Sequence, residues 1–441
     1  MQLQIGAQFW GKASQGAALG ADGTVVKIRQ AYIDWMLPDV NLKNRIGIQF
    51  FMLPNKAEGP AILASRVGAV VSSWEANDNL ALTGFWVRPF NDNYAGYETA
   101  DGVRQANYLD NMDLFGLIAN LRSEGVDLSP WIMYGFRGRN SLWNHGEPWP
   151  RDNSPSSLTN FGTAGNPTFT LFPYPATMNR TEENYTNNNT SKAWGSMFWA
   201  GLPIGITALD TWNLELDINY GYVESMGRYN AYKGIGDRAN RKRSSTQRQG
   251  WLAKAVVEYK MDWGIPGVLG WYATGDDGNP KNGSERIPSL AAYGNFTSFF
   301  GDTGYTLVPW RDNSLDYAGT WGAGLRIRDM SFIEDLTHTF RAVWWGGTNS
   351  PTMAKYMGVA SAWNQGIQNW DGPCLATNDG LLELNLVNKY RMYENLNIYG
   401  ELGYIANFID NDTWDKAGAR NSTFQKQDAW KVQASFVYSF Q

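Results

Sequence analysis

Hydrophobic and polar residues alternate along much of this chain with a period of two. In the stretch 430–441, aromatic or aliphatic residues occupy the even positions and mostly polar residues the odd ones. The pattern recurs at 214–222, 251–260, 317–328, 382–389 and 396–404. Successive side chains of a strand point to opposite faces, so these stretches predict strands with one apolar and one polar face. A single half-buried strand of a soluble protein would show the same pattern.

The joint occurrence of such segments favours a membrane barrel over a soluble fold. We count about sixteen predicted strands, each close to the roughly ten residues that a tilted strand needs to cross a bilayer. Short connections (37–43, 75–79, 123–126, 262–266, 331–335, 393–395) alternate with long ones beginning near 11, 53, 89, 138, 225, 276, 346 and 408. A β-propeller would show a blade repeat of fixed length, and we see none. The prediction is an all-β, transmembrane, antiparallel up-and-down β-barrel that forms a single domain, 1–441.

Composition agrees with a barrel and argues against helical membrane proteins. The 441 residues carry a net charge of -5 and include 47 Gly, 21 Trp and 22 Tyr. No run of eighteen apolar residues occurs, whereas a polar lumen keeps the mean hydropathy of a barrel low. The segment after Met1 lacks the features of a signal peptide, so either a signal has been removed or the sequence begins inside the protein.

One early connection, 53–63, is a candidate to fold into the lumen, because it comes early and is rich in Pro and Gly. Lys56 and Glu58 would then lie at the edge of a constriction. An ordinary outer loop is the alternative. The segments 138–192, 226–249, 276–315 and 346–379 are predicted outer loops.

Strand alternation predicts a set of basic side chains on the polar, pore-lining face. These residues are Lys27, Arg29, Arg45, Arg66, Arg326, Arg328 and Arg341. Rings of Arg and Lys favour anions in a narrow pore. Glu215, Asp217, Glu258, Glu383 and Glu401 share the predicted lumen face and oppose that preference. The expectation is at most mild anion selectivity.

Two surface features suggest partners. The basic segment Arg241, Lys242 and Arg243 would bind lipid or lipopolysaccharide phosphates at the outer surface, or would be a solvated loop with no partner. We expect no nucleic acid to bind a loop beside a pore. Val67, Ala69 and Val71 form a small-residue stripe that we assign to the outer face, where it would pack against another subunit.

Candidate chemistry for catalysis or metal binding is sparse. The chain has one cysteine, Cys374, and two histidines, His145 and His338. These exclude an internal disulfide and leave too few ligands for a histidine-based metal site. An Asp276-Asp277 pair in a Gly-rich turn more often caps a hairpin than catalyses. We therefore predict no enzyme, no metal and no cofactor. A carbohydrate-specific channel is the alternative, since loop tryptophans could stack on sugars: Trp143, Trp149, Trp310 and Trp363.

Several segments together resemble a known family. The runs 20–25, 31–35, 53–55, 61–63, 88–94, 107–115 and 219–223 are similar to the homotrimeric major outer-membrane porins of sulfate-reducing, Desulfovibrio-type bacteria. The resemblance implies a homotrimer in the bacterial outer membrane, in which each subunit has its own pore. It also supports 53–63 as the constriction loop, and implies eighteen strands if an upstream hairpin is missing. The predicted function is a general diffusion porin for small hydrophilic solutes and ions. Alternatives are a substrate-specific carbohydrate or anion channel and, less favoured, a barrel enzyme.

Overall fold

The computed structural model describes residues 2–7, 26–91, 111–138, 189–190, 192–232, 241–279, 281–290, 317–356, 375–416 and 427–439. The strands of its main sheet are β1 (Gln2–Ala7), β2 (Val26–Leu37), β3 (Leu42–Met52), β4 (Ala64–Asn77), β5 (Leu80–Asn91), β6 (Asn111–Ser123), β7 (Val126–Leu128), β8 (Trp131–Gly138), β10 (Trp194–Ile206), β11 (Trp212–Val223), β14 (Arg248–Tyr259), β15 (Ile265–Ala273), β16 (Thr320–Ile333), β17 (Leu336–Gly347), β18 (Gly380–Tyr393), β19 (Leu396–Asn407) and β20 (Ala429–Tyr438). Among the described residues, no helix is long and apolar enough to span a membrane.

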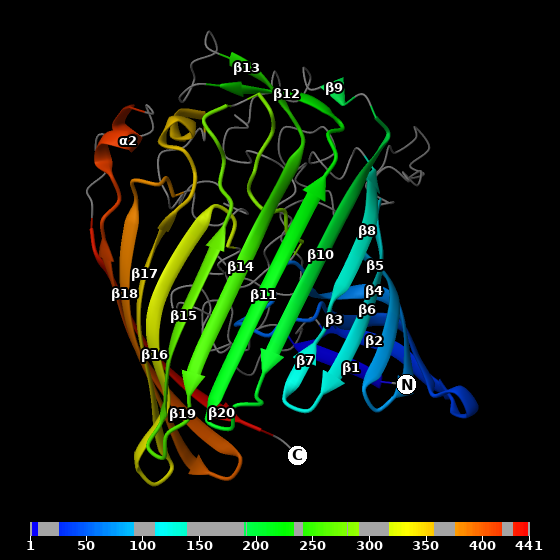
Figure 1. Cartoon of the computed structure of the whole chain (residues 1–441), viewed down its shortest axis with the longest axis vertical. Helices are drawn as coiled ribbons and strands as arrows, with labels where there is room; N and C mark the ends of the chain where they lie inside the picture. The colour runs from blue at the N-terminus through cyan, green and yellow to red at the C-terminus, as the bar shows by residue number, and fades with distance from the viewer. Residues whose placement is uncertain are drawn as a thin grey trace.

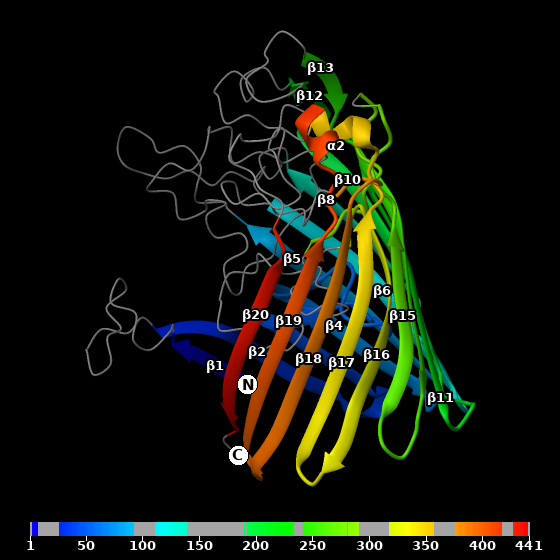
Figure 2. The same ribbon diagram turned by 90° about the vertical axis from the view of Figure 1, so that its left-hand side faces the viewer.

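From β1 to β20 the main-sheet strands pair antiparallel in chain order, except that β7 and β8 each pair with β6 and β10 and not with each other. The sheet contains seventeen strands, but β7 and β8 share one place between β6 and β10, which leaves sixteen strand positions. The sheet curls into a barrel (Figures 1 and 2). The predicted fold class, an up-and-down β-barrel of about sixteen strands, is confirmed.

Short and long connections lie at opposite ends of this barrel. Tight connections join β4 to β5, β16 to β17 and β18 to β19 at one end, which we call the turn end. A three-stranded sheet of β9 (Asn189–Thr190), β12 (Gly227–Tyr232) and β13 (Arg241–Ser245) stands at the other, the loop end, together with the short helix α2 (Asn411–Lys416) (Figure 1). The predicted alternation of short and long connections is therefore present.

The outer face of the sheet exposes large apolar side chains on nearly every strand. Ile48 on β3 is 47% exposed, Leu325 on β16 is 59% exposed and Phe436 on β20 is 72% exposed. Between them lie further exposed aromatic and aliphatic residues on β2, β6, β8, β10, β11, β14, β15 and β17 to β19. A soluble monomer rarely exposes an apolar surface of this extent.

The inner face is less uniformly polar than the alternation suggested. Buried charged groups such as Asp217 and Lys254 share it with fully buried tryptophans, including Trp199 and Trp345. These apolar residues belong to one hydrophobic cluster that also contains residues of the connections at the loop end. The inner wall is therefore a packing surface for inward-folded segments.

The assignment of Val67, Ala69 and Val71 to the outer face is wrong. Val67 pairs with buried Gln49, whereas the neighbouring pair joins Gly68 to exposed Ile48. Val67 and Ala69 are 3% and 2% exposed, and Val71 packs against the same internal cluster. Their small apolar side chains face the internal hydrophobic cluster, so they give no argument for subunit contact.

Candidate functional site

The connection between β3 and β4, residues 53–63, enters the barrel interior. The Leu53 amide donates to the Leu63 carbonyl over 3.0 Å, which brings the two ends of the loop together at the wall. Leu53, Ile62 and Leu63 are at most 2% exposed, and they belong to the internal hydrophobic cluster. We call residues 53–63 the inward loop.

Polar contacts join the tip of the inward loop to strands far from β3 and β4 in the strand order. Lys56 Nζ lies 2.5 Å from Asp127 Oδ2 on β7. Residues 56 and 57 contact Asp217 on β11, residues 57 to 59 contact Lys254 on β14, and Glu58 contacts Arg326 on β16. The inward loop therefore crosses the lumen and follows the inner surface of the opposite wall.

Two charged residues of that wall hold the loop backbone. Asp217 on β11 accepts from the Lys56 amide at 3.1 and 3.2 Å and from the Ala57 amide at 2.7 Å. Lys254 on β14 donates to the carbonyl oxygens of Ala57, Glu58 and Gly59 at 2.6, 3.2 and 2.6 Å. These contacts fix both sides of one turn of the loop.

The Glu58 side chain extends the contact to β16. Its carboxylate forms an ion pair with Arg326, and its carbonyl accepts from the Tyr317 hydroxyl at 2.8 Å. Arg326 also contacts Glu258 at 2.7 Å, and Arg328 contacts the same carboxylate at 2.8 and 3.0 Å. The two predicted pore-lining arginines on β16 therefore share carboxylates rather than presenting a bare positive ring.

Two more of the predicted pore-lining residues, Arg45 and Arg341, face inward. Arg45 faces inward, pairs with Asp34 at 2.6 and 2.8 Å and lies over the Tyr32 ring at 4.1 Å. Arg341 faces inward and is 9% exposed. Lys27 and Arg29 belong to β2, but their side chains lie outside the described residues.

The assignment of Arg66 to the lumen is wrong. Arg66 pairs across the sheet with Phe50, and Phe50 is an outer-face residue that is 47% exposed. Paired residues of an antiparallel ladder lie on the same face. Arg66 is therefore on the outer face. The charge of its side chain alone does not show which face of β4 it occupies.

The first part of the predicted outer loop 276–315 packs against the inward loop and the inner wall of the barrel. Residues 276–279 and 281–290 are described, and Ile287 and Leu290 are fully buried. The Leu290 amide donates to the Ile62 carbonyl of the inward loop at 2.9 Å, and the Trp199 indole donates to the Pro288 carbonyl at 2.9 Å. Apolar residues interrupt this polar stretch, and their burial explains the inward path.

Charged groups anchor the segment 274–290 to the barrel. Arg248 is fully buried at the start of β14, and it donates to the Arg286 and Ile287 carbonyls at 2.9 Å each. Asp276, 1% exposed, accepts from the Ser284 hydroxyl and from the Glu285 amide at 3.1 Å. Burial raises the pKa of Asp276 to about 7, although the positive charges of Arg286 and Arg248 oppose the shift.

The remaining predicted loops are only partly described. The basic segment Arg241, Lys242 and Arg243 lies in β13; Lys242 is exposed, and the Arg241 side chain is outside the described residues. The loop 138–192 is described only at Gly138, 189–190 and Lys192. In 346–379, Met353 and Leu375 are fully buried. His145, Cys374 and four loop tryptophans are outside the described residues: Trp143, Trp149, Trp310 and Trp363.

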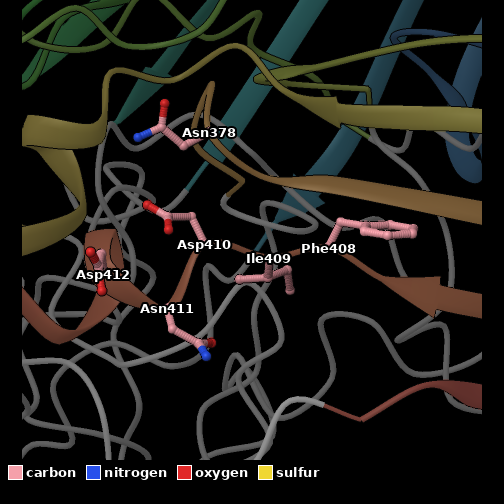
Figure 3. A pocket seen from close by; sticks show the side chains of 6 residues that line it. All are labelled: Asn378, Phe408, Ile409, Asp410, Asn411 and Asp412. Carbon is pink, nitrogen blue, oxygen red and sulfur yellow. The ribbon is translucent and has the colours of Figure 1, made fainter.

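Two cavities lie apart from the contacts of the inward loop. One, of about 580 Å³, is at the loop end beside α2 (Figure 3). Its Asp410 carboxylate accepts from the Thr413 hydroxyl and amide at 2.5 and 3.1 Å, so it caps α2 rather than awaiting a ligand. The other, of about 670 Å³, is lined mainly by inner-face side chains of β2 to β6, including Asp34, Arg45 and Phe51.

The described residues contain no group of three or more His, Cys, Asp or Glu side chains that could hold a metal ion. His338 lies 2.6 Å from Asn388 Oδ1 on the neighbouring strand, through its Nδ1. It alternates with Phe340 and Trp344 toward the outer face, away from the contacts of the inward loop.

Sequence reasoning missed the residues that hold the inward loop most closely. Asp127, Lys254 and Tyr317 are not among the candidate site residues that the sequence predicts. Tyr317 is fully buried against the loop. The sequence signal for Lys254 is a charged residue at an inward position in the middle of the strand, between the apolar inward residues Leu252 and Val256.

Comparisons with known proteins give only distant matches. No protein-family model matches the chain, and no curated protein matches it. Among solved structures, Pseudomonas aeruginosa OccK11 (OpdR) is 12% identical, with a TM-score of 0.42, and the match covers 94% of this chain and 80% of that one. P. aeruginosa OccD3 (OpdP) is 11% identical, with a TM-score of 0.43 and coverage of 95% and 78%. Acinetobacter baumannii OccAB4 is 11% identical, with a TM-score of 0.42 and coverage of 95% and 76%. Likeness at this level establishes no shared function.

Proposed function

We propose that this protein is a diffusion channel of a bacterial outer membrane, through which small hydrophilic solutes and ions pass. The observation that carries the proposal is the contrast between the two faces of one curled sheet. Its outer face exposes aliphatic and aromatic residues such as Ile48, Leu325 and Phe436, and its inner face carries charged residues such as Asp217, Glu258 and Arg326.

The outer-membrane location follows from what a bilayer permits. Backbone groups in hydrocarbon must be hydrogen-bonded within the protein, so a strand protein spans a membrane as a barrel. Short turns at one end and long connections at the other are typical of outer-membrane barrels, whose turns face the periplasm. The turn end would then be periplasmic and the loop end extracellular.

The channel follows from the size of the barrel and from the inward loop. Barrels with sixteen strands leave a lumen that wall side chains do not fill, whereas eight-stranded barrels are filled. The inward loop would narrow this lumen at the level of Lys56 and Glu58. Solutes would pass along its free side, selected by width and by nearby charges.

The ion pairs of the wall favour weak charge selectivity over a clear preference for anions. Arg45 is paired with Asp34, Arg326 with Glu58 and Glu258, and Arg328 with Glu258. Each of these three arginines, which were predicted to attract anions, has a carboxylate within contact distance. We therefore expect the anion and cation permeabilities to differ little.

The test is single-channel current in a planar bilayer under a salt gradient. The proposal expects stepwise insertion of open channels with a reversal potential close to zero. A reversal potential that shows strong selectivity for anions or for cations would support the channel and contradict the expected balance of charges. Absence of current from a folded protein would reject the channel itself.

A substrate-specific channel is the second candidate, and the cavity on the inner face of β2 to β6 favours it. This cavity places the Arg45–Asp34 ion pair beside apolar Phe51 and Val71, an arrangement that could orient a small solute with both polar and apolar parts. Solute flux that saturates at millimolar concentration would support this alternative. Flux that stays proportional to concentration would support general diffusion.

The proposed partners rest on the sequence resemblance and on surface charge. We propose a homotrimer with one pore in each subunit, and contact of the β13 basic segment with lipopolysaccharide phosphates. Cross-linking in detergent and a comparison of lipopolysaccharide retention after Lys242→Ser and Arg243→Ser would test the two. Neither nucleic acid binding nor an enzymatic reaction is part of the proposal.

A further inference from the structure

Lys254 is a buried charge at the centre of the contacts between the inward loop and the far wall. It lies in the middle of β14, and its side chain is fully buried. An isolated ammonium group in such a place would be strongly destabilising, so its neighbours must compensate for lost hydration.

Five oxygen atoms surround the Lys254 ammonium group. Asn55 Oδ1 and the carbonyls of Ala57, Glu58 and Gly59 lie 2.6 to 3.2 Å from Nζ, and Asp217 Oδ2 lies at 3.4 Å. An ammonium group has three hydrogens to donate. The surplus of oxygens indicates that the turn 55–59 is arranged around the positive charge as well as around individual hydrogen bonds.

The backbone of the turn adopts an uncommon conformation to make this arrangement. Glu58 has a φ of 42°, and Gly59 has a φ of 67°. A residue other than glycine is disfavoured in the left-handed region, because its Cβ approaches the following carbonyl oxygen. The interaction of the carbonyls with Lys254 offsets that cost, so the charge and the shape of the turn depend on each other.

We propose that Lys254 and Asp217 form an electrostatic latch that keeps the inward loop across the lumen and so sets the width of the channel. Lys254 holds the carbonyl side of the turn, and Asp217 holds its amide side. Both are positioning residues, because they act on solutes through the loop. This inference rests on the proposed channel function.

The other ionic attachments of the loop are less protected from water. The Lys56 and Asp127 side chains are 27% and 38% exposed, and Glu58 is 16% exposed in its pair with Arg326. Ion pairs in contact with water contribute little, whereas removing one member of a buried pair is strongly destabilising. The latch is therefore the attachment whose loss should release the loop.

The test replaces Lys254 and then rebuilds it chemically. The variant Lys254→Cys is prepared in a Cys374→Ser background, because Cys374 is the only natural cysteine. Treatment of the unfolded variant with 2-bromoethylamine forms a carbon–sulfur bond at the thiolate and releases bromide, which leaves an ammonium group at about the length of lysine. Both forms are refolded and studied by single-channel recording and by hydrogen exchange of amides 55–59.

Loss of the positive charge at position 254 should release the inward loop from the wall, and replacing that charge by alkylation should return the loop to its bound position. Without alkylation we expect conductance to rise about twofold, since the narrowest part of a pore dominates its resistance. We also expect amides 56 and 57 to exchange at least about tenfold faster. Alkylation should return both quantities to those of the Cys374→Ser protein.

The matched control is Lys389→Met, which removes a lysine of β18. Lys389 alternates along the strand with the buried residues Glu383 and Asn385, so it also lies on the inner face. Its conductance and its exchange at 55–59 should equal those of the parent. Unchanged exchange and conductance in Lys254→Cys, or no recovery after alkylation, would overturn the latch. If the parent protein carries no current, the channel proposal fails, and exchange at 55–59 still decides whether the latch exists.

Discussion

Asp276 shows how one buried carboxyl group can make a segment sensitive to pH. It is 1% exposed at the loop end, and its pKa is raised from 3.8 to about 7 by burial. Oδ1 accepts two hydrogen bonds, whereas Oδ2 is buried with no hydrogen-bond partner among the described residues. The neutral acid therefore suits this site better than the carboxylate.

The sign of the pH effect follows from that shift. A group whose pKa is raised on folding stabilises the folded state below its unfolded pKa, and this contribution is lost as the pH rises through the folded pKa. Between pH 4 and pH 7, opening of the segment 274–290 should become up to about tenfold more favourable per pH unit. Hydrogen exchange, corrected for intrinsic rates, would measure it.

The control for this prediction is Asp276→Asn, which keeps a neutral side chain of the same shape. Its segment 274–290 should open to the same extent at pH 5 and pH 8. A wild-type segment with no pH dependence, or an Asn variant with the wild-type dependence, would show that Asp276 is not the responsible group.

Single residues also show where sequence reasoning stops. The alternation at 317–328 predicts a strand that includes Tyr317, but Tyr317 and Gly319 have φ values of 66° and 72°. Two left-handed residues turn the chain before β16 begins at Thr320, so the alternation does not extend to Tyr317. Nothing local in the sequence fixes that turn.

At the scale of elements, strand direction was predictable where the two faces differ in polarity. Strands β11 and β14 separate cleanly into apolar outer and charged inner positions, and both were predicted correctly. Strand β4 has apolar residues on both faces, and Arg66 was the only guide to direction. Its true direction is set by its register with β3 and by the inward loop, which are contacts distant in the sequence.

The corrected direction of β4 makes a prediction with two neighbouring positions. Ala69→Leu should destabilise the protein by about 1 to 3 kcal/mol, because it overfills the internal cluster. Val70→Leu, one residue later on the outer face, should change stability by less than about 0.5 kcal/mol. Equilibrium unfolding in urea from lipid vesicles measures both, and the opposite order of effects would restore the earlier assignment.

The contacts of the inward loop lay beyond sequence reasoning. Its early position and its Pro and Gly content indicated a loop that enters the lumen, but its partners Asp127, Asp217 and Lys254 are 71, 160 and 197 residues away from the atoms they bind. No periodicity relates residues at such distances. The sequence predicts that a loop exists, and the curvature of the sheet decides which strands it touches.

For the whole molecule, the apolar outer face should govern stability in a membrane. Leu325 is 59% exposed near the middle of β16. Leu325→Arg should lower the free energy of unfolding in lipid vesicles by roughly 2 to 4 kcal/mol, because a basic side chain is unfavourable near the bilayer centre. Glu334→Arg, in the turn between β16 and β17, is the control and should have little effect. Equal stability of the two variants would contradict burial of this face in lipid.

The path of the inward loop also has a consequence for the order of assembly. The loop is made early in the chain, but Lys254 and Arg326, which hold it, are made about 200 and 270 residues later. Native contacts with such long separations form late, because the intervening chain must first be ordered. Until β14 and β16 join the sheet, the loop has no wall to bind. The constriction would thus be one of the last features of the barrel to form, after the strands that carry its anchoring residues have joined the sheet.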